Sequence, residues 1–436
     1  MSNTAKSILM LIGILMPRLT AGDLTLELVL QKVVRASYER FDLELQTDEI
    51  NARRRQLTAD YLPSIASSLI STQSEQGPRD VFVGSIPFRQ PATSYAYHSA
   101  SLNLSQPIFD WGNTVRKRKK LQLEAGALKM DYLQKARRVA DQAITIYFQL
   151  SEATEIHSLL RQELSDARRQ QTHLNNLVEQ GIKPVEDQLR NKIIINDILS
   201  RISSETARIA GLRAKLFFLM NTSEDTAVRL TVPNYENPDL VSGASLPSPE
   251  AVYLTRKIRM NETELSILHW DRLPDVTFNA GYSRGNEMFK SLYTNFHQDW
   301  NTYFALNVSI PLFNTRQQRL RETRKRIEIQ RLSRKLSDEQ KDHVQEIARL
   351  KDQIRAVQKQ FELQKESLKY YESIYAHELE RYNTGLIEFQ RLKTARSDVL
   401  QSRISLIKLK HQWLEKQEKL RLNSGEWDTL FTADEN

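Results

Sequence analysis

The sequence contains no cysteine, few glycines and no long apolar run. Without cysteine the chain cannot form disulfides, iron–sulfur clusters, thiolate zinc sites or a thiol nucleophile. Its 13 glycines among 436 residues are less than half the usual share of roughly 7%. We therefore expect few turns and long secondary-structure elements. The longest apolar run, residues 8–16, is too short for a membrane-spanning helix, which needs about 20 residues, and this excludes a helical membrane protein.

The chain is basic, with 62 Lys and Arg against 54 Asp and Glu and a formal net charge of +8. That charge alone is compatible with nucleic acid, a membrane surface or a local patch. Near the start, Lys6 precedes the apolar run, and Leu19-Thr20-Ala21 supplies small residues before Gly22. This order predicts a secretory signal peptide over residues 1–22. A buried N-terminal helix is the alternative.

The chain is an internal duplication. The motif around Pro107 recurs around Pro311, and the motif around Gly181 recurs around Gly385, in both cases 204 positions later. An earlier Leu-Pro pair recurs 211 positions later, so the first half carries seven extra residues between its two strands. We predict one repeat over residues 23–220, a linker over 221–247, a second repeat over 248–422, and a mobile acidic tail over 423–436.

Each repeat is predicted to contain a helix, two strands and two long helices. The first helix covers residues 25–61. No proline interrupts residues 113–180, and residues 315–384 contain neither proline nor glycine. Gly181 and Gly385 stand where each long helix should turn back, because glycine accepts the left-handed conformation of a helix end. Helices of this length must lie in a coiled-coil-like bundle to bury their apolar side chains.

The predicted strands lie at about residues 63–73, 97–107, 274–284 and 301–311. Their apolar residues alternate with small polar ones, as Phe278, Ala280 and Tyr282 alternate with Asn279 and Gly281. Small polar groups opposite an apolar face fit the wet lumen of a membrane barrel, although a soluble sheet is the alternative. Because four strands cannot close a barrel and open edges are not tolerated in lipid, the membrane interpretation requires oligomerisation.

This layout resembles the TolC-type outer-membrane efflux proteins over nearly all of residues 24–422. The matching motifs are Leu62-Pro63, Pro107-Ile108-Phe109-Asp110-Trp111-Gly112, Pro311-Leu312-Phe313-Asn314 and Arg381-Tyr382-Asn383-Thr384-Gly385. The resemblance implies an α+β homotrimer, with twelve strands closing one barrel in the outer membrane and twelve long helices forming a periplasmic tunnel. It places the protein in a Gram-negative-type bacterium, working with a periplasmic adaptor and an inner-membrane transporter. The exported cargo would be drugs or other small molecules, or unfolded proteins in type I secretion.

The residues themselves suggest no chemistry. The eight histidines are scattered, with no pair three or four positions apart that could share a metal. The sequence also lacks a glycine-rich phosphate loop, a nucleophile elbow and a His-Glu-x-x-His motif. We therefore expect no catalytic residues, no metal and no cofactor, and the resemblance likewise implies a protein that is not an enzyme.

The resemblance also assigns a gate. It implies that the helix hairpins at Gly181 and Gly385 form a periplasmic tip, where links between hairpins hold the resting tunnel shut. By motif position, Tyr382 and Asp187 match residues of those links, although Tyr382 could simply pack within its hairpin. The family often has acidic residues six and nine positions after the second glycine, where this chain has Arg391 and Thr394, with Lys393 between them. We therefore expect a basic constriction that favours anions.

Basic residues gather at the predicted helix–strand junctions, and we call this group the basic collar. Three windows, at 53–55, 116–120 and 316–326, hold fourteen Lys or Arg and a single acid, Glu322. Long basic side chains at these places could reach anionic outer-membrane lipid headgroups, while a solvated helix face is the plain alternative. The collar is defined by Arg53, Arg54, Arg55, Arg116, Lys117, Arg118, Lys119, Lys120, Arg316 and Arg319.

A second interpretation is a soluble coiled-coil scaffold with a small β domain. In it, residues 116–120 would form a nuclear-localisation or nucleic-acid patch. That interpretation leaves the shared offset of 204 and the lumen-like strand faces unexplained. It also requires aromatic or recognition-helix features that are absent near the basic run. We therefore favour the membrane duct and expect no nucleic-acid partner.

Overall fold

The computed structural model describes residues 23–223, 229–231, 247–294, 300–310 and 315–432. The chain divides into two compact units. The helical unit holds residues up to Glu44, Lys129–Val252 and the chain from Ser337 onward, and the strand unit holds Leu45–Leu128 and Tyr253–Leu336. The predicted signal peptide and most of the predicted linker lie outside the described residues.

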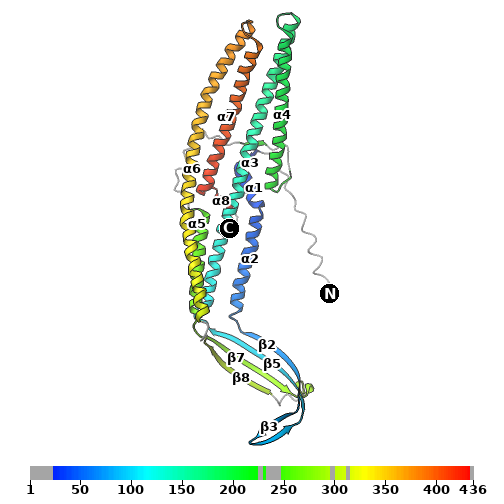
Figure 1. Ribbon diagram of the computed structural model, residues 1–436, viewed down its shortest axis with the longest axis vertical. Helices are drawn as coiled ribbons and strands as arrows, with labels where there is room; N and C mark the ends of the chain where they lie inside the picture. Colours follow the sequence, from blue (N-terminus) through cyan, green and yellow to red (C-terminus); the bar gives the residue numbers. More distant parts are fainter. Residues whose placement is uncertain (1–22, 224–228, 232–246, 295–299, 311–314, 433–436) are drawn as a thin grey trace. The chain divides into compact units, whose positions relative to one another are not determined.

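The strand unit is built on a four-stranded antiparallel sheet (Figure 1). Its order is β2 (Ser64–Gln76), β5 (Thr93–Phe109), β7 (Asp275–Asn286) and β8 (Trp300–Ser309). A separate hairpin of β3 (Arg79–Val83) and β4 (Ile86–Gln90) lies between β2 and β5 in the chain. A short 3-10 helix, η1 (Phe289–Leu292), follows β7. Each outer strand, β2 or β8, is paired on one side, so the sheet is open within one chain.

The pairing register places the predicted apolar residues on a single face of the sheet. Phe278 lies opposite Leu306, and Leu102 lies opposite Tyr282. Residues directly opposite in an antiparallel pair point to the same side, and side chains alternate along each strand. The other face carries small polar groups, among which Ser68 and Ser101 share a hydrogen bond of 2.7 Å between their hydroxyls. Among the described residues this apolar face is exposed, with Leu306 at 66% and Leu102 at 50%.

A tight turn joins the sheet to the long helix α3 (Asn113–Glu179). Trp111 and Gly112 have positive φ angles of 54° and 77°. The Asp110 carboxylate accepts hydrogen bonds from the backbone N–H groups of Gly112 at 3.0 Å and Thr114 at 2.7 Å. These bonds satisfy donors that the start of a helix leaves free. The indole Nε1 of Trp111 donates to the Pro274 carbonyl at 2.7 Å and so ties the turn to the start of β7.

The two repeats produce matching helices. Helix α3 has 67 residues and α6 (Thr315–Asn383) has 69, while α4 (Val185–Leu219) has 35 and α7 (Phe389–Ser424) has 36. Helix α2 (Tyr38–Ala59) and helix α5 (Pro249–Trp270) each have 22 residues and precede the strands of their repeats. No described helix is both long enough and apolar enough to cross a membrane.

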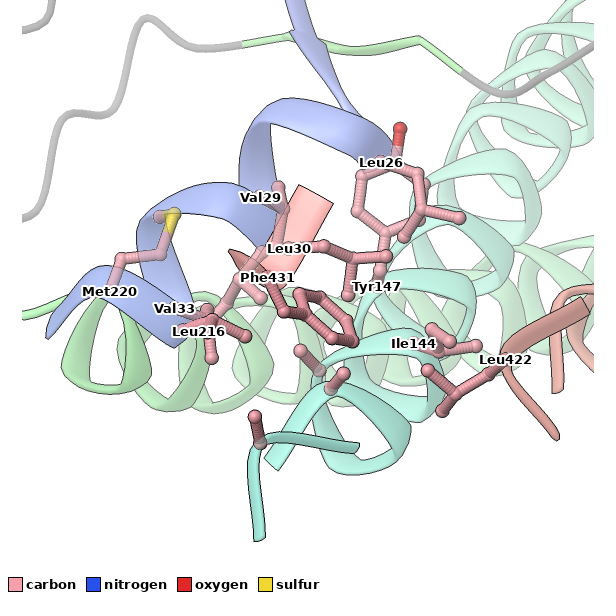
Figure 2. Packing of buried hydrophobic residues seen from close by; sticks show 14 of the residues in the cluster. Leu26, Val29, Leu30, Val33, Ile144, Tyr147, Leu216, Met220, Leu422 and Phe431 are labelled. Atoms are coloured by element: carbon pink, nitrogen blue, oxygen red, sulfur yellow. The ribbon is translucent and has the colours of Figure 1, made fainter. Parts of the chain in front are cut away.

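The main core lies in the helical unit, where α1 (Leu26–Ala36) packs against the longer helices (Figure 2). Leu26, Val29, Leu30 and Val33 recur at helical spacing and are all buried. The buried Tyr147 of α3 donates its hydroxyl to the carbonyls of Leu24 at 3.0 Å and Thr231 at 2.7 Å. These two acceptors belong to the short parallel pair β1 (Asp23–Thr25) and β6 (Arg229–Thr231), so Tyr147 fixes that pair to the core.

Two sequence-based expectations were wrong. The single helix expected over residues 25–61 is divided at Ser37, whose hydroxyl donates to the Val34 carbonyl at 2.8 Å and ends α1. The tail expected to be mobile contains helix α8 (Asp428–Thr432). Asp428 accepts two hydrogen bonds from the Arg137 guanidinium at 2.8 and 2.5 Å, and the Phe431 side chain is 5% exposed within the core. A long-range ion pair and a core aromatic therefore hold α8 against the helical unit.

Candidate functional site: the hairpin tip

The hairpin tip consists of the two turns that connect α3 to α4 and α6 to α7. Gly181 and Gly385 adopt φ angles of +71° and +78°, where any other residue type would be strained. In each turn a backbone N–H reaches back to the end of the preceding helix, from Ile182 to the Leu177 carbonyl and from Leu386 to the Arg381 carbonyl, both at 2.8 Å. The duplicated glycines therefore produce the same turn twice.

Tyr382 and Asp187 connect the two hairpins. The Tyr382 hydroxyl, near the end of α6, donates to Oδ2 of Asp187, in the first turn of α4, at 2.7 Å. Both residues are buried, with 3% of Tyr382 and 8% of Asp187 exposed. Burial, and then the hydrogen bond to Asp187, raise the pKa of the Tyr382 hydroxyl. The phenol is therefore a neutral donor to a carboxylate at physiological pH.

Apolar side chains surround this hydrogen bond. The Phe389 ring meets the Tyr382 ring edge to face, with 5.6 Å between the ring centroids. Leu174 and Leu392 complete the buried cluster. Excluding water lowers the local dielectric, which strengthens a hydrogen bond that is made and raises the cost of leaving its groups unpaired.

Lys183, which the sequence did not single out, also reaches Tyr382. Its Nζ donates to the Tyr382 carbonyl at 2.7 Å and lies 4.0 Å from the centroid of the Tyr382 ring. Lys183 belongs to the turn of the first hairpin and Tyr382 to the second, so this contact also joins the two hairpins. No periodic pattern marks a single lysine in a turn, and only the fold reveals its target.

The remaining predicted tip residues lie apart from this link. Arg391 is exposed on the first turn of α7 and Lys393 is partly exposed further along it. One residue before Arg391, the Gln390 Oε1 accepts a hydrogen bond from Arg190 Nη1 of α4 at 3.0 Å. The structure therefore brings Tyr382 and Asp187 together, whereas Arg391 and Lys393 take no part in their hydrogen bond.

Farther along the hairpins, an ionic cluster joins α3 to α7. The mostly buried Glu163 carboxylate accepts from Arg396 Nη2 and Arg403 Nη1, both at 3.3 Å. Arg396 Nη2 also donates to the Glu163 carbonyl at 3.0 Å, and Arg403 Nη2 donates to Glu372 of α6 at 2.8 Å. One acid thus holds two arginines, so removing it would leave both guanidinium groups without their central partner.

A second ionic cluster on the same pair of helices contains a histidine. The Glu155 carboxylate lies 2.8 Å from Nε2 of the buried His411 and 3.1 Å from Nζ of Lys410. The hydrogen bond with His411, followed by the charge and hydrogen bond of Lys410, lowers the pKa of Glu155 despite its partial burial. Glu155 is therefore an anion at neutral pH, and it needs a proton donor at Nε2 of His411.

Part of the basic collar is bound to neighbouring side chains of the strand unit. Arg53 pairs with Glu49 at 2.5 Å and Glu124 at 3.2 Å, and Lys120 pairs with Glu264 at 3.0 Å. The further pairings are Arg118 Nη2 to the Thr58 hydroxyl at 3.1 Å, Arg116 Nη1 to the Trp111 carbonyl at 2.7 Å, and the Arg116 guanidinium 4.5 Å from the Trp270 ring centroid. These four collar residues thus help to join α2, α3, α5 and the turn before α3.

The other six collar residues are exposed. They comprise Arg54, Arg55, Lys117, Lys119, Arg316 and Arg319. These six residues belong to the strand unit, and their exposed side chains are accessible to anions. Within the described ranges, no group of three or more His, Asp or Glu side chains is arranged to hold a metal ion.

Comparison with protein families assigns residues 42–192 and 264–426 to the outer membrane efflux protein family. The chain belongs to this family. The first matched segment includes the turn at Gly181, and the second includes the turn at Gly385. The family resemblance predicted from the motifs is therefore confirmed, and the outer membrane efflux proteins are a family of channels rather than of enzymes.

Solved structures of outer-membrane channels share the fold of this outer membrane efflux protein. CusC is 14% identical, with 92% of each chain covered and a TM-score of 0.75. The CmeC channel of Campylobacter jejuni is 15% identical, covering 92% of this chain and 85% of its own, with a TM-score of 0.75. VceC of Vibrio cholerae is 14% identical, covering 92% and 96%, with a TM-score of 0.71. No curated protein sequence matches the chain.

These likenesses confirm the predicted α+β class with long helices. At such identities they establish the fold and carry no information on cargo. Among the described residues, the four strands form a sheet whose outer strands β2 and β8 are each paired on one side.

Proposed function

We propose that three copies of this protein form an outer-membrane duct through which a tripartite efflux or type I secretion system expels its cargo. The open sheet with one uncovered apolar face is the observation that carries this proposal. Lipid tolerates no unpaired strand edge, and pairing β8 of one copy with β2 of the next closes twelve strands by threefold symmetry. The apolar face would then contact lipid and the small polar face would line the lumen.

The long helices supply the rest of the duct. A helix of 67 residues rises about 100 Å at roughly 1.5 Å per residue, far more than a membrane requires. In the proposed assembly these helices stand in the periplasm of a Gram-negative-type bacterium. They would meet a periplasmic adaptor there, and the adaptor would connect the duct to an inner-membrane transporter. Family membership supports these partners and this location.

We further propose that the hydrogen bond from Tyr382 to Asp187 holds the hairpin tip closed. It joins the two hairpins of one chain, and its donor and acceptor are buried together. Separating the hairpins breaks one charge-assisted hydrogen bond, which a partner protein can offset by binding the open form more tightly.

Arg391 and Lys393 would make the tip favour anions. They occupy a stretch where the family often carries acids, and Arg391 is exposed. Exposed cations around a constriction attract anions and repel cations. Reversal potentials in a salt gradient test this proposal. Anion preference that weakens in Arg391→Asp supports it, whereas cation preference in the unaltered protein contradicts it.

Purified protein in detergent and in planar bilayers tests the duct itself. We expect a heat-sensitive trimer in the outer-membrane fraction and discrete conductance steps after reconstitution. A monomer that fractionates with the cytoplasm and forms no conducting unit would overturn the proposal and favour the coiled-coil scaffold.

A further inference from the structure

Tyr382 is held by the first hairpin at two separate places. Asp187 accepts from its hydroxyl at 2.7 Å, while Lys183 donates to its carbonyl at 2.7 Å and lies 4.0 Å from its ring centroid. The two contacts use different atoms of the tyrosine and come from opposite ends of a five-residue stretch that enters α4.

We propose that Lys183 is a positioning residue for the gate, which fixes the Tyr382 ring and main chain so that the hydroxyl reaches Asp187. This inference rests on the proposed function of the hairpin tip. Lys183 adds a cationic contact between the two hairpins, which would otherwise be joined here only by the hydrogen bond of the Tyr382 hydroxyl.

Three physical effects place the ammonium group there. The Tyr382 carbonyl lies one residue before the end of α6, where the helix dipole is negative. It accepts from the Gly385 N–H at 3.1 Å, and its second lone pair is available to Lys183. A cation donating to it therefore gains a charge-assisted hydrogen bond. The same ammonium faces the electron-rich tyrosine ring within the distance of a cation–π contact. Tyr382 cannot leave Asp187 by a shift of α6 without also moving away from Lys183.

The duplication shows that this contact is built only once per chain. The residue 204 positions after Lys183 is Ile387, and the residue 204 positions before Tyr382 is Val178. Neither can reproduce the contact, because Ile387 has no charge and Val178 has no ring or hydroxyl. The first hairpin therefore supplies the lysine and the second supplies the tyrosine.

Single-channel recordings of the reconstituted trimer test the inference. Lys183→Met keeps an unbranched apolar stem and removes the charge, and we expect the open probability to rise about tenfold. Lys183→Arg should restore most of the closure, because a guanidinium also donates to carbonyls and stacks on rings. Lys192→Met, which removes an exposed lysine of α4, the helix that follows Lys183, is the matched control and should leave the open probability unchanged.

Double variants separate positioning from general stability. In Tyr382→Phe no hydroxyl is left to position, so adding Lys183→Met should raise the open probability less than it does in the unaltered protein. In Tyr382→Leu the ring is absent, and the same addition should have a smaller effect. The thermal unfolding midpoint should stay the same in Lys183→Met.

The failures are distinguishable. If Tyr382→Phe opens the channel and Lys183→Met does not, the role of Lys183 is wrong and the proposed gate stands. An effect of Lys183→Met as large in the Tyr382→Phe background as in the unaltered protein would also overturn the positioning role. If neither the unaltered protein nor any of its variants conducts ions, the proposed duct itself is wrong.

Discussion

The Tyr382 phenol keeps its proton well beyond neutral pH, because burial, followed by the hydrogen bond to Asp187, raises its pKa above the ordinary value of 10.0. For an acid whose pKa is raised by folding, the contribution to stability is fully present below the ordinary pKa and is lost only as the pH rises through the folded value. The Tyr382 hydroxyl therefore remains a hydrogen-bond donor to Asp187 around neutral pH. Titration of this phenol would therefore not open the proposed gate near neutral pH.

The first prediction concerns the Tyr382 hydroxyl. Tyr382→Phe keeps the ring, removes the hydrogen bond and leaves the Asp187 carboxylate buried, which costs about 1.5–3 kcal/mol of closed-state stability. We expect a more often open channel in bilayer recordings. Because the two residues form one interaction, Asp187→Ala added to Tyr382→Phe should change little more. Fully additive effects would contradict the direct link.

A second prediction uses the lowered pKa of Glu155. Since folding depresses this pKa, the carboxylate stabilises the α3–α7 contact above its ordinary pKa of 4.5 and loses that contribution as the pH falls through the folded value. Glu155→Gln should lower the thermal midpoint at pH 7, and the difference from the unaltered protein should shrink towards pH 3. The exposed Glu366→Gln on α6 is the control. A difference that grows on acidification would contradict the assignment.

At the scale of elements, local sequence patterns predicted the strands, the long helices and their turns. They did not predict contacts between residues that are far apart in the sequence. The alternation in β7, the proline-free helices and the turn glycines Gly181 and Gly385 are all local, and each was predictable. The docking of α8 was not, because Arg137 and Asp428 are 291 positions apart. Lys183 was missed for the same reason, since its partner lies 199 positions away.

The docking of α8 leads to a third prediction. Phe431→Ala should empty part of the core around α1 and destabilise the helical unit by about 3–5 kcal/mol, since the remaining side chains can fill the cavity only in part. Thermal unfolding followed by circular dichroism measures the loss. Leu386→Ala is the control, because that side chain is 69% exposed in the turn of the second hairpin. An unchanged midpoint in Phe431→Ala would mean that the tail helix contributes nothing.

The two faces of β8 supply a fourth prediction. Leu306→Arg puts a charge on the apolar face and should cost about 2–4 kcal/mol in the middle of a bilayer, whereas Asn307→Arg puts the same charge on the polar face. We expect the first variant to lose most of its heat-sensitive trimer in the membrane fraction and the second to keep it. Equal yields from both would argue against lipid on the apolar face.

At the scale of the whole molecule, the basic collar separates into a bound part and an exposed part. Arg53, Lys120, Arg116 and Arg118 serve the packing of the strand unit through their partners. We propose that the exposed collar residues contact anionic lipid headgroups at the inner surface of the outer membrane. Basic groups near an anionic surface gain about 1 kcal/mol each, and the gain is screened by salt.

The fifth prediction tests this lipid contact. Replacing Arg316 and Arg319 together with Gln should weaken binding to vesicles containing anionic phospholipid by roughly 2 kcal/mol, or about thirtyfold, at low salt. Flotation of the purified trimer with such vesicles measures the effect. Arg355→Gln with Lys359→Gln, on the exposed face of α6 in the helical unit, is the matched control. Equal flotation of both variants would contradict the lipid contact and would favour the alternative that these residues form a solvated helix face.

The duplicated halves, alike in length but unequal at Lys183 and Tyr382, have a consequence for symmetry. A trimer would contain six similar hairpins, which alone would suggest a tip with sixfold symmetry. Within one chain Asp187 and Lys183 bind Tyr382, whereas the reverse pairing has Val178, Ile387 and Arg391 at the equivalent positions. The six hairpins of the proposed trimer would therefore be linked as three pairs. An aperture built in this way would widen with threefold rather than sixfold symmetry.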